Sequence, residues 1–209
     1  MPHVLYFHGF ASSPHSRKVT SLRELLAPDG IELETPDLNV PSFARLDFEA
    51  MVDLGVRCAR ARPPRLIVGS SLGSLVGLEV ARRGIDAPLV LIAPALGIAR
   101  RWIDELPAGD PVSVFNHAHD AKLPIHRAFF ERMARVDADA HPPARAVSVI
   151  IGRNDESVGF GNVERVWGEW ERSGELAEGS RFVEIAEGDH GLVDFVDVIA
   201  AEMRRRLTD

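Results

Sequence analysis

The sequence predicts one α/β domain in which about six mostly parallel strands carry helices on both faces. Short apolar runs alternate with stretches whose apolar residues recur at helical spacing. The run Leu89–Ala93 is apolar throughout, which is typical of a strand buried on both faces. The 209 residues, 45% of them hydrophobic, suit a single well-packed core. Since no repeat, low-complexity tract or linker interrupts the chain, residues 1–209 are interpreted as one domain.

The elements follow from these patterns in chain order. Val4–Phe7 is the first expected strand, and Ser13-Pro14 resembles an N-cap followed by the first turn of a helix that stops at Pro28–Gly30. Pro63-Pro64 ends the second expected helix. The remaining strands are expected at residues 31–35, 65–69, 89–93, 147–151 and 181–185, and the remaining helices at about 45–62, 72–83, 163–170 and 192–207.

The segment Ala95–Ala146 breaks the alternation. It contains no convincing strand, and its only helical patterns lie around Trp102 and at residues 126–136, between turns rich in Pro and Asp. A connection of this length is unusual inside a compact α/β domain. The sequence therefore predicts a cap or lid inserted at residues 95–146.

Charge and composition restrict the class of protein. The formal net charge is -7, which argues against a nucleic acid or an anionic membrane as the main partner. The single cysteine, Cys58, permits no intrachain disulfide and sits on the apolar face of an expected helix, where it suits the core. A strand begins almost at Met1, which leaves no space for a signal peptide, and no apolar run is long enough to span a bilayer. We expect a cytoplasmic protein, and the sequence does not predict its oligomeric state.

The chain's most informative motif is Gly69–Gly73, a G-x-S-x-G pattern between an expected buried strand and an expected helix. A serine on such a sharp turn is pushed out of the sheet, and its hydroxyl stands at a helix N-terminus that favours negative charge. Side chains at the two glycines would crowd the turn. Ser71, at the centre of the motif, is therefore the candidate nucleophile, and a Ser/Gly-rich loop without catalytic function is the alternative interpretation.

A serine nucleophile needs a general base and an acid that orients the base. Asp155 and His190 each follow an expected strand, and they complete the chain order Ser, Asp/Glu, His. His190 is the only histidine that follows a strand downstream of Asp155. Glu156 is the alternative acid, a helix cap is the alternative role of Asp155, and Asp189 is interpreted as a turn residue.

Acyl transfer also needs donors for the oxyanion of the tetrahedral intermediate. The backbone N–H of Leu72, directly after the candidate nucleophile, is one expected donor. The second is expected from the loop after the first strand, where Gly9 gives the backbone freedom and Phe10 supplies the amide. Gly9 and Ser70 adjoin these groups and are assigned to the substrate-binding site, whereas His8 is expected to be a structural loop residue.

No metal or other cofactor is predicted. The cluster His117-Ala-His119-Asp120 matches no common zinc spacing and has no cysteine nearby, so we expect a polar cap surface or a substrate contact there. Four aromatic residues of the inserted segment either line an apolar acyl pocket or form a small core of the cap itself: Trp102, Phe115, Phe129 and Phe130.

Several motifs together resemble a known family. They are His8-Gly-Phe-Ala-Ser-Ser-Pro14, Ser16-Arg-Lys18, Gly69–Gly73, Ala93-Pro-Ala95, Asp155-Glu156 and Gly188-Asp-His190. They are similar to the small bacterial α/β-hydrolases of the YqiA type, along nearly the whole chain except residues 97–144. The resemblance implies a compact α/β-hydrolase fold and esterase activity on simple esters, with Ser71, Asp155 and His190 in the triad positions.

The residues and the resemblance together predict a serine hydrolase that cleaves carboxylic esters with small or medium acyl chains. A thioester substrate or perhydrolase chemistry on the same triad is an alternative. A non-catalytic binding protein on a hydrolase scaffold is the alternative from another functional class, because a fold does not fix a function.

Overall fold

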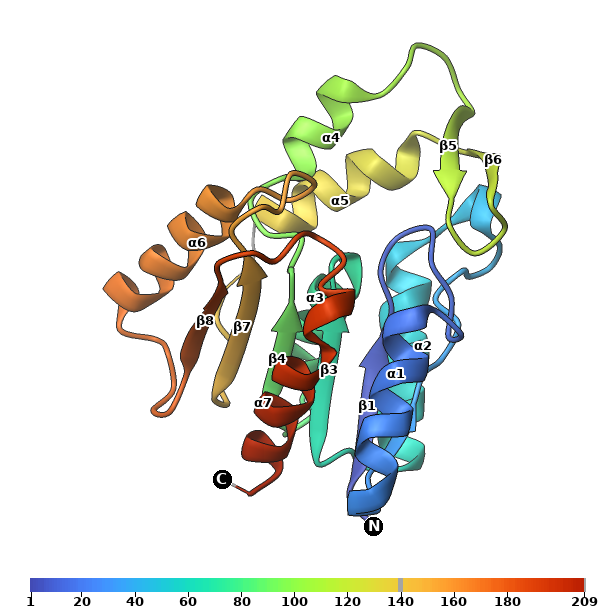
Figure 1. Cartoon of the computed structure of the whole chain (residues 1–209). Coiled ribbons are helices and arrows are strands. Elements are labelled where there is room, and N and C mark those ends of the chain that lie inside the picture. The colour runs from blue at the N-terminus through green and yellow to red at the C-terminus, as the bar shows by residue number, and fades with distance from the viewer. Residues whose placement is uncertain (139–140, 209) are drawn as a thin grey trace.

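A computed structural model describes residues 1–138 and 141–208. In this part of the chain six parallel strands form one twisted sheet in the order β2-β1-β3-β4-β7-β8 (Figure 1). The strands are β1 (His3–Phe7), β2 (Glu32–Glu34), β3 (Leu66–Ser70), β4 (Leu89–Ile92), β7 (Val147–Gly152) and β8 (Arg181–Ile185). The predicted fold class of six mostly parallel strands is confirmed, and all five strand pairings are parallel.

The strand register brings the expected site loops to one edge of the sheet. Phe7 at the end of β1 pairs with Gly69 of β3, Ile92 of β4 pairs with Ile150 of β7, and Gly152 of β7 pairs with Ile185 of β8. The carboxyl ends of parallel strands lie at a common edge, where α/β proteins bind their ligands. The loops after β1, β3, β7 and β8 therefore meet there although they are far apart in the sequence.

Helices cover both faces of the sheet. α1 (Arg17–Leu26) and α7 (Val196–Thr208) lie side by side in front of the strands in Figure 1, and α2 (Phe48–Ala61) packs on α3 (Leu72–Arg82) behind them. α6 (Phe160–Ser173) packs against β7. The central strands β1, β3, β4 and β7 are buried along their full length, so the main core lies on the two faces of the sheet.

The first helix begins later than predicted. Its N-cap is Ser16, whereas the N–H of Ser16 donates a hydrogen bond to the carbonyl of Ser13 across a turn. The Ser13-Pro14 pair therefore belongs to a loop and not to the helix start, because this local bond closes the turn before the helix begins. Residues 8–16 consequently form an extended loop above the sheet, and this loop contributes to the site described below.

The segment between β4 and β7 contains the two predicted helical pieces and one element that the sequence analysis missed. The helices are α4 (Ala99–Glu105) and α5 (Ala128–Ala138), and β5 (Val112–Asn116) and β6 (Ala121–Ile125) form an antiparallel hairpin between them. The expectation of no strand in this segment was wrong. Figure 1 shows these elements beyond the carboxyl ends of the parallel strands. Residues 139 and 140 of the predicted insertion lie outside the described residues, as does residue 209 of the predicted domain.

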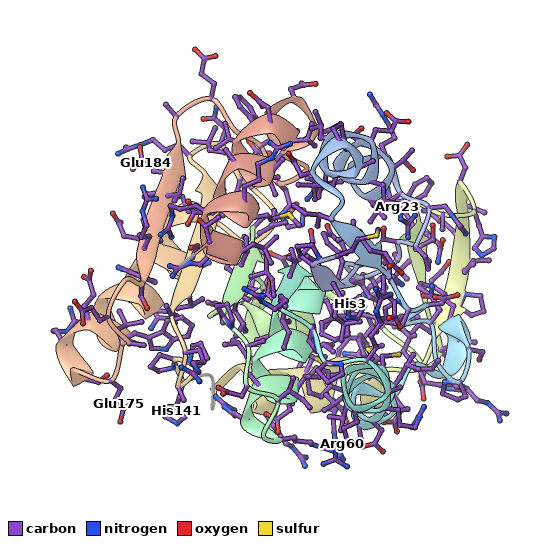
Figure 2. All side chains as sticks on the ribbon, turned by 90° about the horizontal axis from the view of Figure 1, so that it is seen from below. His3, Arg23, Arg60, His141, Glu175 and Glu184 are labelled. Atoms are coloured by element: carbon purple, nitrogen blue, oxygen red, sulfur yellow. The ribbon has the colours of Figure 1, made fainter. Side chains whose placement is uncertain are left out.

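Charged side chains gather on the outside of the molecule. In the view from below, Arg60, Glu175 and Glu184 project from its periphery (Figure 2), and all three are exposed. Glu184 on the edge strand β8 pairs with Arg153. Across the described ranges, no helix is long and apolar enough to cross a membrane.

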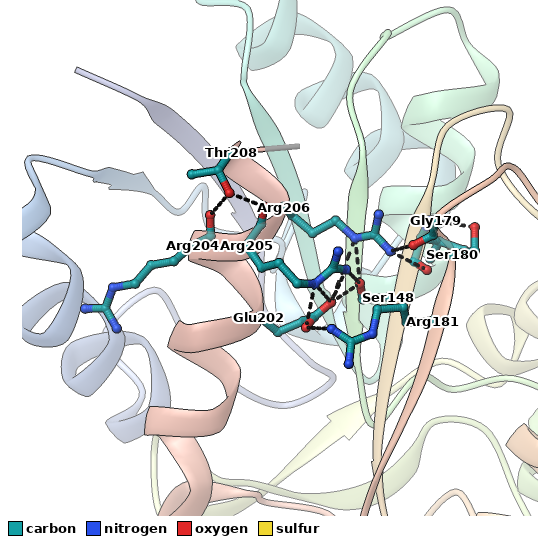
Figure 3. A network of polar contacts seen from close by, with 10 residues as sticks. Ser148, Gly179, Ser180, Arg181, Glu202, Arg204, Arg205, Arg206 and Thr208 are labelled. Carbon is teal, nitrogen blue, oxygen red and sulfur yellow. Dashed lines mark hydrogen bonds and ion pairs between the residues drawn. The ribbon is translucent and has the colours of Figure 1, made fainter.

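A polar network fastens α7 to β7 and β8 at the end of the sheet opposite the site loops (Figure 3). Glu202 of α7 is buried, accepts a hydrogen bond from Ser148 of β7, and pairs with Arg181 and Arg205. The buried Arg206 donates to Ser148 at 2.6 Å and to the carbonyl of Gly179 at 2.6 Å. Because every carboxylate and guanidinium here has partners of opposite charge or polarity, the charges are tolerated beneath the helix.

Candidate functional site

Ser71 occupies a strained turn between β3 and α3. Its backbone has φ 53° and ψ −119°, a conformation that L-residues rarely adopt outside functional sites. The Ser71 N–H donates to the carbonyl of Ile92, and the Ser71 carbonyl accepts from the N–H groups of Ser74 and Ala95. The Ser74 hydroxyl donates to the carbonyl of Gly69 at 2.9 Å. These bonds fix the turn and hold Ser71 at the carboxyl edge of the sheet.

The two glycines of the motif are required by space. A Cβ on Gly69 would lie 2.4 Å from the carbonyl oxygen of Gly73, and a Cβ on Gly73 would lie 2.1 Å from the carbonyl oxygen of Phe7. Both contacts are with backbone atoms, which cannot rotate away. The close approach of α3 to β3 and β1 therefore depends on glycine at both positions, as the sequence pattern predicted.

Asp155 and His190 are in direct contact. His190 Nδ1 lies 2.9 Å from Asp155 Oδ2, across the loops that follow β7 and β8. The Asp155 carboxylate is fully buried, and its other oxygen accepts from the N–H groups of Ser157 and Val158. Asp155 thus ties together its own loop and also orients His190. The alternative acid, Glu156, is exposed, and among the described residues its side chain forms no hydrogen bond or ion pair with His190.

The two loops are joined before they reach these side chains. A Cβ on Gly152 would lie 2.1 Å from the carbonyl oxygen of Gly188, and the N–H of Asn154 donates to that same carbonyl at 2.9 Å. Asp189 accepts from the N–H of Leu192 at 2.8 Å, so it is a turn residue, as predicted. The close backbone contact fixes the distance between the Asp155 and His190 loops, which the sequence pattern did not reveal.

The loop after β1 lies against Ser71. A Cβ on Gly9 would be 3.3 Å from Ser71 Cβ and 4.0 Å from its Oγ. His8 supports this loop: Leu38 N–H donates to His8 Nε2 at 2.9 Å, so the ring proton resides on Nδ1, which donates to the Gly9 carbonyl at 2.9 Å. Burial lowers the pKa of His8, which favours this neutral ring. The predicted structural role of His8 fits these contacts.

Two backbone N–H groups border the same space. Leu72 is the first residue of α3, so its N–H has no acceptor inside the helix. Within the described residues the Phe10 N–H donates no backbone hydrogen bond. In a trans peptide the C=O and N–H point in opposite directions, so the bond from His8 to the Gly9 carbonyl also fixes the direction of the Phe10 N–H.

Ser71 and His190 lie on the walls of two adjoining pockets. One pocket has a volume of about 320 Å³, and its apolar wall consists of Phe10, Trp102, Leu106 and Phe130. Phe10 is central, with ring centroids 6.0 Å from Trp102 and 5.7 Å from Phe130. We call this the apolar pocket. The aromatic residues of the 95–146 segment thus do both of the predicted things: Trp102 and Phe130 line a pocket, Phe129 is buried, and Phe115 is exposed.

The second pocket, of about 750 Å³, is lined mostly by residues with polar side chains. Its wall contains Gly9, Arg17, Lys18, four histidines and six serines, one of which is Ser70. We call this the basic pocket. Lys18 reaches from the start of α1 and donates to Ser70 Oγ at 3.1 Å. Burial lowers the pKa of Lys18 to about 8, against the opposing effect of the Asp189 and Asp155 charges.

Tyr6 of β1 is buried and lies on the wall of the same pocket as Lys18 and Ser70. Burial raises the pKa of Tyr6 above its ordinary value, so Tyr6 is a neutral partner. Ser70, beside the strained turn, therefore shares this wall with a phenol and is hydrogen-bonded to an ammonium. The sequence analysis gave Lys18 and Tyr6 no role. The signal was the rarity of lysine: Lys18 is one of two lysines in the chain, and all its other Lys or Arg positions are arginines.

In the cluster of His117, His119 and Asp120, only His117 belongs to the site. His117 is on the wall of both pockets, and its N–H donates to the carbonyl of Ala11 at 2.9 Å. His119 and Asp120 are exposed at the hairpin turn. Among the residues that the structure describes, no group of three His, Cys, Asp or Glu side chains is placed to hold a metal ion.

Solved structures share the fold. An esterase domain of a Rhodothermus marinus protein is 22% identical with a TM-score of 0.71, over 99% of this chain and 88% of that one. Est1E from Butyrivibrio proteoclasticus is 15% identical with a TM-score of 0.72, over 100% and 89%. The monoacylglycerol lipase of Paleococcus ferrophilus is 18% identical with a TM-score of 0.71, over 96% and 93%. At these identities the likeness establishes the α/β-hydrolase fold.

A comparison with curated proteins finds no match. A family profile, in contrast, matches residues 3–201, almost the whole chain, and confirms the resemblance to the YqiA type that the sequence motifs predicted. The chain belongs to UPF0227, described as an uncharacterised protein family.

Proposed function

We propose that the protein is a serine hydrolase that cleaves carboxylic esters with small or medium acyl chains. The observation that carries the proposal is the 2.9 Å contact between His190 Nδ1 and Asp155 Oδ2, on a pocket that Ser71 shares. Asp155 holds the proton on Nδ1, which leaves Nε2 free to act as a base toward the pocket. The strained turn at Ser71 supplies the nucleophile.

The reaction takes two steps. His190 Nε2 removes the Ser71 proton while Oγ attacks the ester carbonyl, and the N–H groups of Phe10 and Leu72 stabilise the oxyanion. The C–O bond to the alcohol breaks, and the alcohol leaves with the proton from His190. Water then attacks the acyl-enzyme, His190 accepts its proton, and the carboxylic acid leaves as the proton returns to Ser71.

The apolar pocket supports the limit on acyl size. Its volume of about 320 Å³ lies at the lower end of small-molecule sites, and the apolar side chains of its wall other than Phe10 come from the 95–146 segment. We assign this segment the role of a cap that receives the acyl chain. Thioesters enter the proposal as a second substrate type, because the same triad and oxyanion donors act on them.

The direct test is Ser71→Ala. We expect loss of 4-nitrophenyl butyrate hydrolysis by roughly 10⁵-fold or more, down to the background rate. Covalent labelling of wild-type Ser71 by a fluorophosphonate, absent in Ser71→Ala, identifies the nucleophile independently of substrate choice. Ser113→Ala is the matched control, because Ser113 is an exposed serine on β5 that lines neither pocket. A wild-type protein that takes no label would favour the non-catalytic binding protein.

A further inference from the structure

We propose that the basic pocket binds an oxyanion group, a carboxylate or a phosphate, carried by the alcohol part of the ester. This inference rests on the proposed function, because it names the substrate class for the same site. Ser71, His190 and Phe10 are on the walls of both pockets, so a substrate with its carbonyl at Ser71 extends into each of them. The acyl chain takes the apolar pocket, and the alcohol part is left for the basic one.

The first argument is the charge of the wall. The chain carries 31 acidic residues against 24 lysines and arginines, yet no Asp or Glu is among the described residues that line the basic pocket. Its formally charged side chains are those of Arg17 and Lys18, and the four histidines beside them include the neutral ring of His8. A protein with a net charge of -7 thus presents a locally basic cavity of about 750 Å³ beside the candidate nucleophile. Such a cavity attracts an anion and disfavours a cation.

The second argument is the state of Lys18. Among the described residues, no carboxylate forms an ion pair with the Lys18 ammonium, although arginines such as Arg62, Arg83 and Arg145 all do so at the surface. Lys18 has three N–H donors, and Ser70 takes one of them. Asp155 and Asp189 act on Lys18 only through space, because within the described residues neither carboxylate forms a hydrogen bond or an ion pair with it. A half-buried cation with spare donors is a site for an incoming anion.

The third argument is the orientation of α1. The basic pocket takes part of its wall from Ser16, Arg17 and Lys18, the N-cap and first residues of this ten-residue helix. The Ser16 side chain makes no capping hydrogen bond, and the first N–H groups of a helix have no acceptor inside it. The positive end of the helix therefore faces the same space as the Lys18 ammonium. Carboxylates and phosphates bind where these two features coincide.

The test compares butyrate esters of three phenols: 3-butyryloxybenzoate, 3-butyryloxyphenyl phosphate, and the uncharged 3-butyryloxybenzamide. The first two distinguish a carboxylate from a phosphate, and the amide has nearly the size of the carboxylate. At neutral pH we expect kcat/KM for at least one anionic ester to exceed that for the amide by about ten-fold or more, the range of a hydrogen bond to a charged group. Equal values for all three esters would overturn the proposal.

Variants assign the preference to one residue. Lys18→Met, which keeps most of the side-chain volume, should lower the ratio of anionic to neutral kcat/KM by about ten-fold, and Lys18→Arg should restore most of it. Lys122→Met is the matched control, because it removes the chain's other lysine from an exposed position on β6. A preference that survives in Lys18→Met would overturn the assignment.

The outcomes separate this inference from the proposed function. If 3-butyryloxybenzamide is hydrolysed by wild type but not by Ser71→Ala, the proposed function stands whatever the anionic esters do. If none of the three esters is hydrolysed and the fluorophosphonate does not label Ser71, the proposed function fails first. Labelling of Lys18→Met by the same fluorophosphonate, together with an unchanged unfolding midpoint, establishes that a change in the ratio reflects the lost charge and not a lost fold.

Discussion

Asp155 Oδ2 accepts from His190 Nδ1 at 2.9 Å, and the two residues are 35 positions apart in the sequence. The backbone bond from Asn154 to the carbonyl of Gly188 lies directly beneath this contact. The orientation of His190 is thus set twice, by the joined loops and by the buried carboxylate. A base held in this way loses little freedom when substrate binds, which favours a chemical role for the pair.

Asp155→Asn should lower kcat for 4-nitrophenyl butyrate by about 10³- to 10⁴-fold, because an amide no longer holds the proton on His190 Nδ1. Glu156→Gln is the neighbouring control and should stay within about two-fold of wild type, since the Glu156 side chain is exposed. Steady-state kinetics of both variants decide between the two acids. The opposite pattern, with activity lost in Glu156→Gln and kept in Asp155→Asn, would transfer the role to Glu156.

The selectivity of the basic pocket should depend on pH. Since the pKa of Lys18 is lowered from 10.5 to about 8, the ammonium is charged below that value and is neutral above it. The ratio of kcat/KM for the anionic ester to that for the amide should therefore fall as pH rises through about 8, because kcat/KM reports groups of the free enzyme. The other titratable or charged groups around Lys18 are Tyr6, His8, His15, Arg17, His117, Asp155, Asp189 and His190.

Dividing kcat/KM for one ester by kcat/KM for the other cancels the effect of groups, such as the catalytic base, whose titration affects both substrates alike. Lys18→Arg is the control for the remainder, because a guanidinium stays charged throughout this range and its ratio should be flat. A wild-type ratio that does not change between mildly acidic and alkaline pH, or a ratio that falls equally in Lys18→Arg, would show that Lys18 is not the titrating group.

The apolar pocket makes a prediction about acyl length. Trp102→Ala removes an aromatic wall 6.0 Å from the Phe10 ring, and it should lower kcat/KM for 4-nitrophenyl hexanoate by about ten-fold while the acetate changes by less than about three-fold. Phe115→Ala is the control from the same segment, because Phe115 is 45% exposed and outside both pockets. If both esters lose activity equally, Trp102 supports the fold of α4 and does not contact the acyl chain.

Much of this fold was predictable because its signals are local. The four central strands of the large sheet are short, mostly apolar runs, and the Gly69–Gly73 pattern reports a steric requirement inside one turn. The order of Ser71, Asp155 and His190 then placed the three loops at one edge, since parallel strands share a direction. Those inferences needed no knowledge of which distant residues touch.

The parts that the sequence did not predict depend on distant contacts. β5 and β6 have a weak alternation of buried and exposed residues. Pro124 argues against a central strand, and it is tolerated in β6 because this strand pairs on one side only, with β5. Lys18 touches Ser70, which is 52 positions away, and nothing near Lys18 in the sequence records that contact. The start of α1 was misplaced because Pro14 follows a serine in a turn just as it does at a helix start.

Glu202 should stabilise the fold without contributing to the candidate active site. Burial acts to raise the pKa of its carboxyl, but hydrogen bonds from Arg205 and Ser148 outweigh this and hold the pKa below 4.5. The charged form is therefore favoured by folding, so its contribution is complete above the unfolded value of 4.5 and is lost as pH falls through the lower folded value. Glu202→Gln keeps the shape and removes the charge among Arg181, Arg205 and Arg206.

We expect Glu202→Gln to lower the free energy of unfolding by about 2 kcal/mol at neutral pH, measured by urea denaturation, because it leaves the buried Arg206 and its two partly exposed neighbours without their counter-charge. The difference from wild type should shrink in acid, where Glu202 is itself protonated. Glu184→Gln is the matched control, since Glu184 pairs with Arg153 at the exposed edge of β8 and such pairs contribute little. Equal effects of the two substitutions would mean that burial beneath α7 adds nothing to the Glu202 network.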